Sequence, residues 1–194
     1  MKRLLIAVLL LSACATNAGN PLKIVLQSDD PEIRAVMRDP EKHQVQILYT
    51  RIERAQGDNL ILRDHSYNLD SDNYFYPAST VKLPAAVIAL EYLQTIEGVT
   101  PYTPYTIEGH PREHTIADDI REIFAVSDNE AYNRIYELLG RDHINRALRS
   151  KGIGPVRISE RLSTPDSGNP QRDTLLFETD GATTALGGGT DEPI

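Results

Sequence analysis

Cysteine, long apolar runs and positive charge are all scarce in this sequence, and each shortage excludes a class of protein. Cys14 is the only cysteine, so the chain can form no internal disulfide and offers no cysteine cluster for zinc or an iron–sulfur centre. The N-terminal apolar run, Leu4 to Leu11, is too short to span a bilayer. Lysine and arginine total 20 against 28 acidic residues, which gives a net charge of −8 at pH 7. An acidic chain without a basic patch argues against a nucleic-acid partner.

The N-terminus has the order of a targeting segment. Lys2 and Arg3 precede the apolar run, and small residues follow it up to Cys14. This order predicts a signal peptide over residues 1–13. The stretch before Cys14 resembles the bacterial lipoprotein signal, which implies lipidation of Cys14, export, and anchoring in the bacterial envelope, with the outer membrane facing the periplasm as the expected site. The alternatives are a simple secretory signal or a buried hydrophobic start. We expect residues 14–29 to form a tether to the bilayer and residues 30–194 to form the domain.

The segment around Ser79 is the first candidate for chemistry. Ser79 lies three residues before Lys82, at the start of an apolar run that predicts a buried helix. Residues three apart share a helix face, so the Lys82 amine is expected beside the Ser79 hydroxyl, where burial makes the amine a better proton acceptor. Pro84 predicts a tight first turn, with the regular helix beginning near it. On the spacing alone, an N-capping serine followed by a solvated lysine is the favoured interpretation.

A second candidate is the triplet Ser127-Asp128-Asn129, which lies between two predicted helices. The first helix is expected to begin with Thr115 as its cap, and the second to stop at Gly140. Three polar residues at such a junction are either a plain cap and turn or a set of side chains directed into a cleft. The occurrence of both motifs at helix ends, 48 residues apart, favours the cleft.

With these two motifs the chain resembles the penicillin-recognising serine hydrolases, most closely the class A β-lactamases. The resemblance covers about residues 31–152. It implies that Ser79 is the acylated nucleophile, Lys82 its activating amine, Ser127 the proton donor to the leaving nitrogen, and Asn129 the amide that holds the substrate side chain. Asp128 would be structural. The substrate would be a β-lactam or a peptidoglycan-like small molecule, with no metal and no cofactor.

Two features of the class A pattern are missing. The family pattern Glu-Pro-x-Leu-Asn supplies a glutamate that hydrolyses the acyl-enzyme, but this chain has Thr164 at that place, with Glu160 and Asp166 as possible substitutes. The family's Lys-Thr-Gly strand is also missing, because no lysine follows Lys151. Deacylation and the oxyanion hole are therefore in question.

The expected fold is α/β (α+β), a β-lactamase/transpeptidase-like antiparallel sheet covered by helices. Asp30-Pro31 predicts a helix start, and residues 45–52 and 60–62 predict a hairpin. We expect residues 98–112 to be an extended surface loop. After Phe177 we expect no strand pair, so that the domain lacks its C-terminal strands as a truncated chain would.

Several alternatives stay open at this stage. On the same scaffold the chain would be a D-Ala-D-Ala peptidase or an esterase. A rival of another class is a non-catalytic lipoprotein that binds penicillin or peptidoglycan, and the simplest is an inactive remnant. His110 and His114 have a metal-like spacing, but Pro111 separates them and no third ligand is near, so solvated loop histidines are expected.

Overall fold

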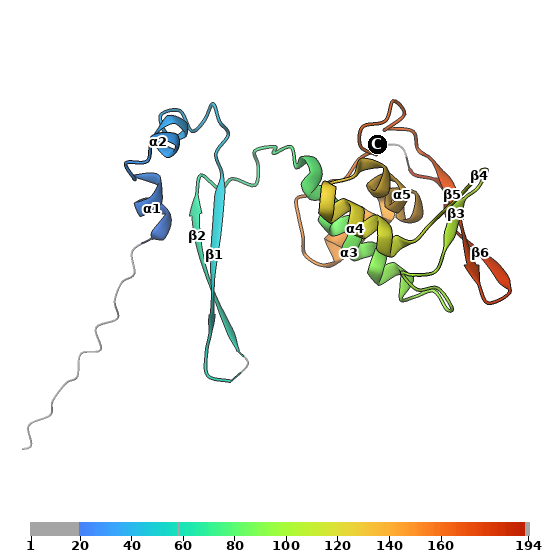
Figure 1. Ribbon diagram of the computed structural model, residues 1–194. Helices are drawn as coiled ribbons and strands as arrows, with labels where there is room; N and C mark the ends of the chain where they lie inside the picture. The colour runs from blue at the N-terminus through green and yellow to red at the C-terminus, as the bar shows by residue number, and fades with distance from the viewer. Residues whose placement is uncertain (1–19, 58, 193–194) are drawn as a thin grey trace, which may run out of the picture. The chain divides into compact units, whose positions relative to one another are not determined.

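The computed structural model describes residues 20–57 and 59–192, and the chain divides into two compact units between Tyr74 and Phe75 (Figure 1). The predicted signal peptide and Cys14 lie outside the described residues, as does the first part of the predicted tether. The rest of that tether contains a short helix, α1. Within the described chain, no helix is both long enough and apolar enough to cross a membrane.

Unit 1 consists of two short helices and a hairpin. Its elements are α1 (Pro21–Leu26), α2 (Pro31–Met37), β1 (Ile47–Arg54) and β2 (Leu60–Tyr67). The Asp30-Pro31 helix start is confirmed, because an Asp30 carboxylate oxygen accepts hydrogen bonds from two backbone N–H groups of the first turn, the shorter at 2.9 Å. The hairpin is confirmed as well, with β1 and β2 antiparallel.

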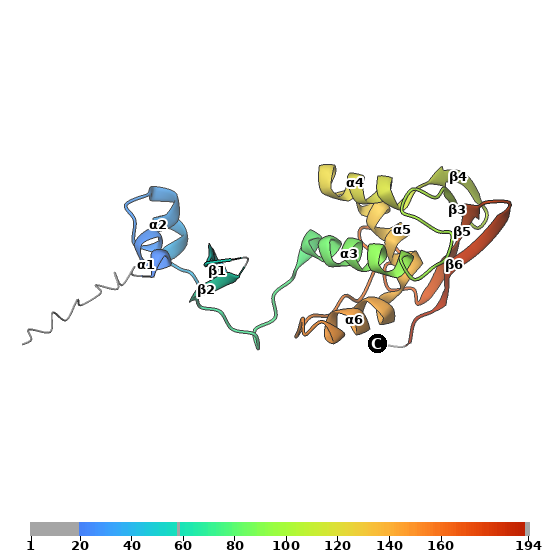
Figure 2. The same ribbon diagram turned by 90° about the horizontal axis from the view of Figure 1, so that it is seen from below.

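Unit 2 carries the core and all of the candidate site residues other than Cys14. Its elements are the 3₁₀ turn η1 (Ala78–Val81), α3 (Lys82–Leu93), β3 (Tyr105–Ile107), β4 (His110–His114), α4 (Ile116–Val126), α5 (Asn129–Leu139), α6 (Arg141–Ser150), β5 (Gln171–Thr179) and β6 (Ala182–Thr190). The four α-helices gather on one side of the sheet (Figure 2).

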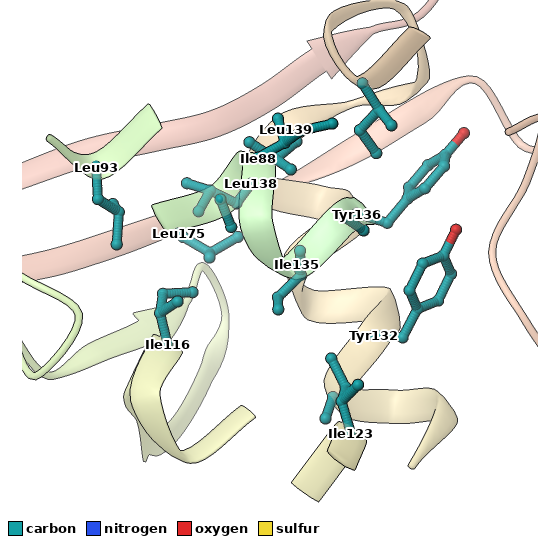
Figure 3. Packing of buried hydrophobic residues seen from close by; sticks show 14 of the residues in the cluster. Ile88, Leu93, Ile116, Ile123, Tyr132, Ile135, Tyr136, Leu138, Leu139 and Leu175 are labelled. Carbon is teal, nitrogen blue, oxygen red and sulfur yellow. The ribbon is translucent and has the colours of Figure 1, made fainter. Parts of the chain in front are cut away.

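Helix α5 is the centre of unit 2. It contacts α3, α4 and α6, and also β5 and β6 of the sheet. Its apolar side chains Ala131, Ile135 and Leu138 are buried against these neighbours. Figure 3 shows Ile135 among the core side chains, while the rings of Tyr132 and Tyr136 project together from α5. A helix surrounded in this way has little freedom to shift, so it is a rigid base for the residues at its N-terminal end.

The sheet of unit 2 is antiparallel, with strand order β4-β3-β5-β6. The expectation of a surface loop over residues 98–112 is wrong in its second half, which forms β3 and β4. Tyr105 of β3 is fully buried and pairs with Phe177 of β5. Its hydroxyl donates to the buried carboxylate of Asp119, to which Arg134 also donates at 2.6 Å. A three-residue strand has too short a pattern to be read locally, and its partner lies far along the chain.

The expectation of no strand pair after Phe177 is also wrong, because β5 and β6 form a long hairpin. The three consecutive glycines of β6 concealed the strand, since glycine is depleted in strands. Gly187 has a reason to be there. Its φ is +72°, and a Cβ atom at this position would lie 2.6 Å from the backbone oxygen of Glu137. The missing side chain lets β6 lie directly against α5.

Candidate functional site

The first site segment is the junction of η1 and α3. Ser79 is exposed in the 3₁₀ turn, and the backbone N–H of Lys82 bonds to the Ser79 carbonyl as α3 begins. Pro84 lies in the first turn of α3, where its missing N–H costs no hydrogen bond. The predicted tight turn before a regular helix is therefore confirmed.

Lys82 is the most unusual side chain of the site, because it is charged and only 2% exposed. Its ammonium donates to the Ser127 backbone oxygen, to the Ser127 hydroxyl at 3.1 Å, and to Asn129 Oδ1 at 2.7 Å. Burial lowers the pKa of Lys82 from its ordinary 10.5, and the Asp128 carboxylate opposes this effect. Since burial dominates, the neutral amine needed by a general base is more accessible than in an exposed lysine.

The second site segment is the junction of α4 and α5. Ser127 ends α4 in the left-handed conformation, with φ at +56°. Asp128 is the N-cap of α5, and its Oδ1 accepts from the Ala131 backbone N–H at 2.7 Å. Asn129 is the first residue of α5 and is half-buried. The triplet is therefore both a helix cap with a turn and a set of converging side chains. The chain reverses at Ser127, so that Ser127 and Asn129 both reach the Lys82 amine.

The structure brings three of the four predicted chemical groups together by direct hydrogen bonds. Lys82, Ser127 and Asn129 form one cluster, which joins α3 to the α4–α5 junction. Ser79 lies one turn before Lys82, on the exposed end of the same segment. In the described chain, Lys82 Nζ is hydrogen-bonded to Ser127 and Asn129 and not to the Ser79 hydroxyl. Catalytic hydrogen bonds are often long before substrate binds.

The loop before β5 contributes a residue that sequence analysis missed. Asn129 Nδ2 donates to the hydroxyl of Ser163 at 2.8 Å. The carboxylates considered for this loop are engaged elsewhere: Glu160 accepts from Ser167 at 3.0 Å, and Asp166 from the Thr164 hydroxyl at 2.5 Å. Among the residues that the structure describes, neither carboxylate is hydrogen-bonded to the cluster. No local pattern marks Ser163, since an isolated serine in a loop is common.

A buried ion pair holds this loop in place. Arg161 donates from Nε and Nη2 to the two carboxylate oxygens of Glu137 on α5, the second at 3.0 Å. Its remaining N–H groups donate to the backbone oxygens of Asn169 and Gln171, each at 2.7 Å. The Arg161 guanidinium also lies 5.2 Å from the centre of the Tyr136 ring. Both charges of the pair are 7% exposed, so the loop is fixed to α5 by groups that are fully paired.

The two histidines noted in the sequence lie at the ends of one strand. His110 and His114 are the first and last residues of β4. Over residues 20–57 and 59–192, no group of three His, Cys, Asp or Glu side chains is placed to hold a metal ion. Tyr105 is a core residue, whereas Tyr74, Tyr76 and Tyr102 are exposed.

The described part of the chain has a mixed α/β architecture, with six α-helices and antiparallel sheets, which is consistent with a β-lactamase-like fold. Comparison with protein families matches residues 30–185 to the Beta-lactamase enzyme family. This match covers most of the chain, so the chain belongs to that family. Neither the curated proteins nor the solved structures gave a significant match. Family membership supports the general class of β-lactam-hydrolysing serine hydrolases and agrees with the motifs at Ser79 and Ser127.

Proposed function

We propose that this chain is a class A-like serine hydrolase that opens β-lactam amides through an acyl-enzyme on Ser79. The observation that carries the proposal is the buried Lys82 amine, which lies one turn after Ser79 and is hydrogen-bonded to Ser127 and Asn129. Burial of this amine costs free energy that a purely structural lysine would avoid at the surface. An amine with a lowered pKa, one turn along the chain from a candidate nucleophile, is typical of an activated serine.

The proposed reaction gives each group of the site a step. Lys82 accepts the proton of Ser79 as the Ser79 oxygen attacks the lactam carbonyl carbon, and the backbone N–H of Ser79 stabilises the oxyanion. The C–N bond then breaks as Ser127 gives its hydroxyl proton to the leaving nitrogen. The Lys82 ammonium, hydrogen-bonded to the Ser127 hydroxyl at 3.1 Å, gives the proton taken from Ser79 back to the Ser127 oxygen. Asn129 holds the carbonyl of the substrate's side chain. Water finally hydrolyses the ester and restores the Ser79 hydroxyl.

Incubation of the full chain with a fluorescent penicillin tests the proposal. We expect intact mass measurement and peptide mapping to place one adduct on Ser79. Ser79→Ala should remove the adduct, while Ser71→Ala, which deletes another exposed hydroxyl, should retain it. The absence of any adduct on the unsubstituted chain would refute acylation at Ser79.

A second candidate function is a penicillin-binding protein that acylates and deacylates slowly. It is favoured by the loop before β5, where Ser163 rather than a carboxylate is bonded to Asn129. A water attacking the ester needs a general base, and the two loop carboxylates are hydrogen-bonded to other partners. Rapid hydrolysis of a chromogenic cephalosporin would favour the β-lactamase. A long-lived adduct would favour the slow protein, whether a D-Ala-D-Ala peptidase or a binding lipoprotein.

We also propose that the chain is exported and anchored by lipid on Cys14. The support is the order of charged, apolar and small residues before Cys14. Metabolic labelling with a radioactive fatty acid should mark the protein, and Cys14→Ser should abolish the label. Equal labelling of both forms would refute lipidation at this residue.

A further inference from the structure

Ser163 belongs to the site through a row of contacts between its loop and α5. The α5 residues Asn129, Asn133 and Glu137 are four apart and therefore lie on one face of the helix. They contact three consecutive loop residues in the opposite order. Glu137 pairs with Arg161 and Asn129 bonds to Ser163.

Asn133 is the middle contact of this row. Its side chain accepts from the Leu162 backbone N–H at 2.7 Å and donates to the Leu162 carbonyl at 2.9 Å. This double contact fixes the peptide units on both sides of Leu162. Arg161, which precedes Leu162, is held by the buried ion pair with Glu137. Ser163 therefore follows a segment that is fixed to α5 at two successive residues.

The backbone conformation of Ser163 also points to a functional position. Its φ is +55°, in the left-handed region that costs a residue with a Cβ atom about 1–2 kcal/mol. In described unit 2, three non-glycine residues have positive φ: Ala78, Ser127 and Ser163. The first precedes the proposed nucleophile, and the others contact Lys82 or Asn129. Backbone strain of this kind collects at functional sites.

The hydrogen bonds of Asn129 show what the Ser163 hydroxyl does. Asn129 Oδ1 accepts from Lys82 at 2.7 Å, and Nδ2 donates to Ser163 at 2.8 Å. A carboxamide has two N–H donors, and the second has no hydrogen bond within the part of the chain that the structure describes. Two opposed contacts hold the amide plane so that this second N–H keeps a fixed direction.

We propose that Ser163 is a positioning residue that orients Asn129 toward the side-chain carbonyl of a β-lactam substrate. This inference rests on the proposed function of Asn129. Without the Ser163 hydroxyl, Asn129 is held only at Oδ1, and its free N–H can swing away from the substrate. The loss is therefore confined to substrates that carry a side-chain carbonyl, while proton transfer by Lys82 and Ser127 continues.

The test uses Ser163→Gly in the full chain, because glycine removes the hydroxyl and adopts positive φ without strain. Acylation rates are measured with a penicillin that carries an acylated side chain and with 6-aminopenicillanic acid, which lacks that carbonyl. We expect the first rate to fall about 3- to 10-fold, the value of one net hydrogen bond. The second rate should stay within about 2-fold. Thr164→Ala, which removes the neighbouring hydroxyl, should change neither rate.

Two further variants separate positioning from a structural effect. Ser163→Asn supplies a carbonyl acceptor and tolerates positive φ, so it should recover part of the lost rate. In an Asn129→Ala background, Ser163→Gly should have no further effect, because the group that it positions is gone. An equal fall with both penicillins, or no fall with either, would overturn the proposal.

A measurement without substrate tests the positioning role of Ser163 independently of the proposed hydrolase function. NMR relaxation of the Asn129 side-chain amide should show a higher order parameter in the unsubstituted chain than in Ser163→Gly. Equal order parameters would overturn the positioning role, whatever the activity of the chain. If the unsubstituted chain forms no Ser79 adduct but Ser163→Gly lowers the order parameter of the Asn129 amide, the hydrolase function is refuted and the contact between Ser163 and Asn129 is established.

Discussion

Replacement of Arg161 by methionine should destabilise unit 2 and release the loop that carries Ser163. Among the described residues, the variant leaves the buried Glu137 carboxylate with one hydrogen-bond partner, the Asp173 backbone N–H at 2.7 Å. It also deletes the hydrogen bonds to the carbonyls of Asn169 and Gln171. Methionine has a similar length and is apolar, so the main change is the loss of the charge and its donors.

The expected loss follows from the burial of the pair. Removal of one partner from a buried ion pair costs about 3–5 kcal/mol, because the other charge stays in a poor solvent. A domain of this size has an unfolding free energy of about 5–15 kcal/mol, so the loss is a large part of the total. Glu137→Gln in the same chain should recover some of the loss, because it removes the unpaired charge.

Urea denaturation followed by circular dichroism measures this effect. We expect the midpoint to fall for Arg161→Met with little change in the slope, because the surface exposed on unfolding is nearly the same. Arg121→Met is the matched control, since Arg121 is 70% exposed and solvent screens its pair with Asp118. Equal midpoints for the two variants would refute the assignment of the Arg161 pair as the anchor of the loop.

Three other changes test the site and the fold. Burial lowers the pKa of Lys82, so the acylation rate should rise with pH and reach its plateau below pH 10.5. Lys82→Arg should remove this rise of the rate with pH. A plateau reached only above pH 10.5 would contradict the role of Lys82 as the base. Gly187→Ala should lower the unfolding free energy by about 2 kcal/mol or more in urea denaturation, because its Cβ atom meets the Glu137 backbone oxygen. Gly168→Ala has open space around its Cβ atom and should lower it by under about 1 kcal/mol. Equal losses would refute the close approach of β6 to α5. Asp128→Ala removes the α5 cap and should cost about 1 kcal/mol by thermal unfolding, and an unchanged midpoint would show that the cap contributes nothing.

The lowered pKa of Lys82 makes the unfolding free energy depend on pH in a definite direction. The folded state binds the Lys82 proton less tightly than the unfolded chain does, because burial lowers the pKa of this amine. The unfolded state therefore holds more protons between the lowered pKa and 10.5, and the contribution of Lys82 to the unfolding free energy rises with pH across that window. In Lys82→Met this contribution to the pH dependence should disappear.

Local features were predictable because they depend on residues close in the chain. The Asp30 cap, the Thr115 cap of α4 and the stop at Gly140 each follow from contacts within one helical turn. The spacing of Ser79 and Lys82 follows in the same way from the geometry of a helix start. The convergence of Lys82 with Ser127 was expected only through resemblance to a family, since no local rule brings these two residues together.

The sequence by itself determined the helix caps, the hairpin of unit 1, the turn before Lys82 and the residue types of the two motifs. Only the tertiary structure decided that β3 pairs with β5, that the glycine-rich β6 is a strand, and that Ser163 rather than a carboxylate meets Asn129. The physical reason is the separation along the chain of the residues that make each contact. Caps and turns are local, whereas these contacts join segments that lie far apart in the chain and depend on the packing of α5, the sheet and the Arg161 ion pair.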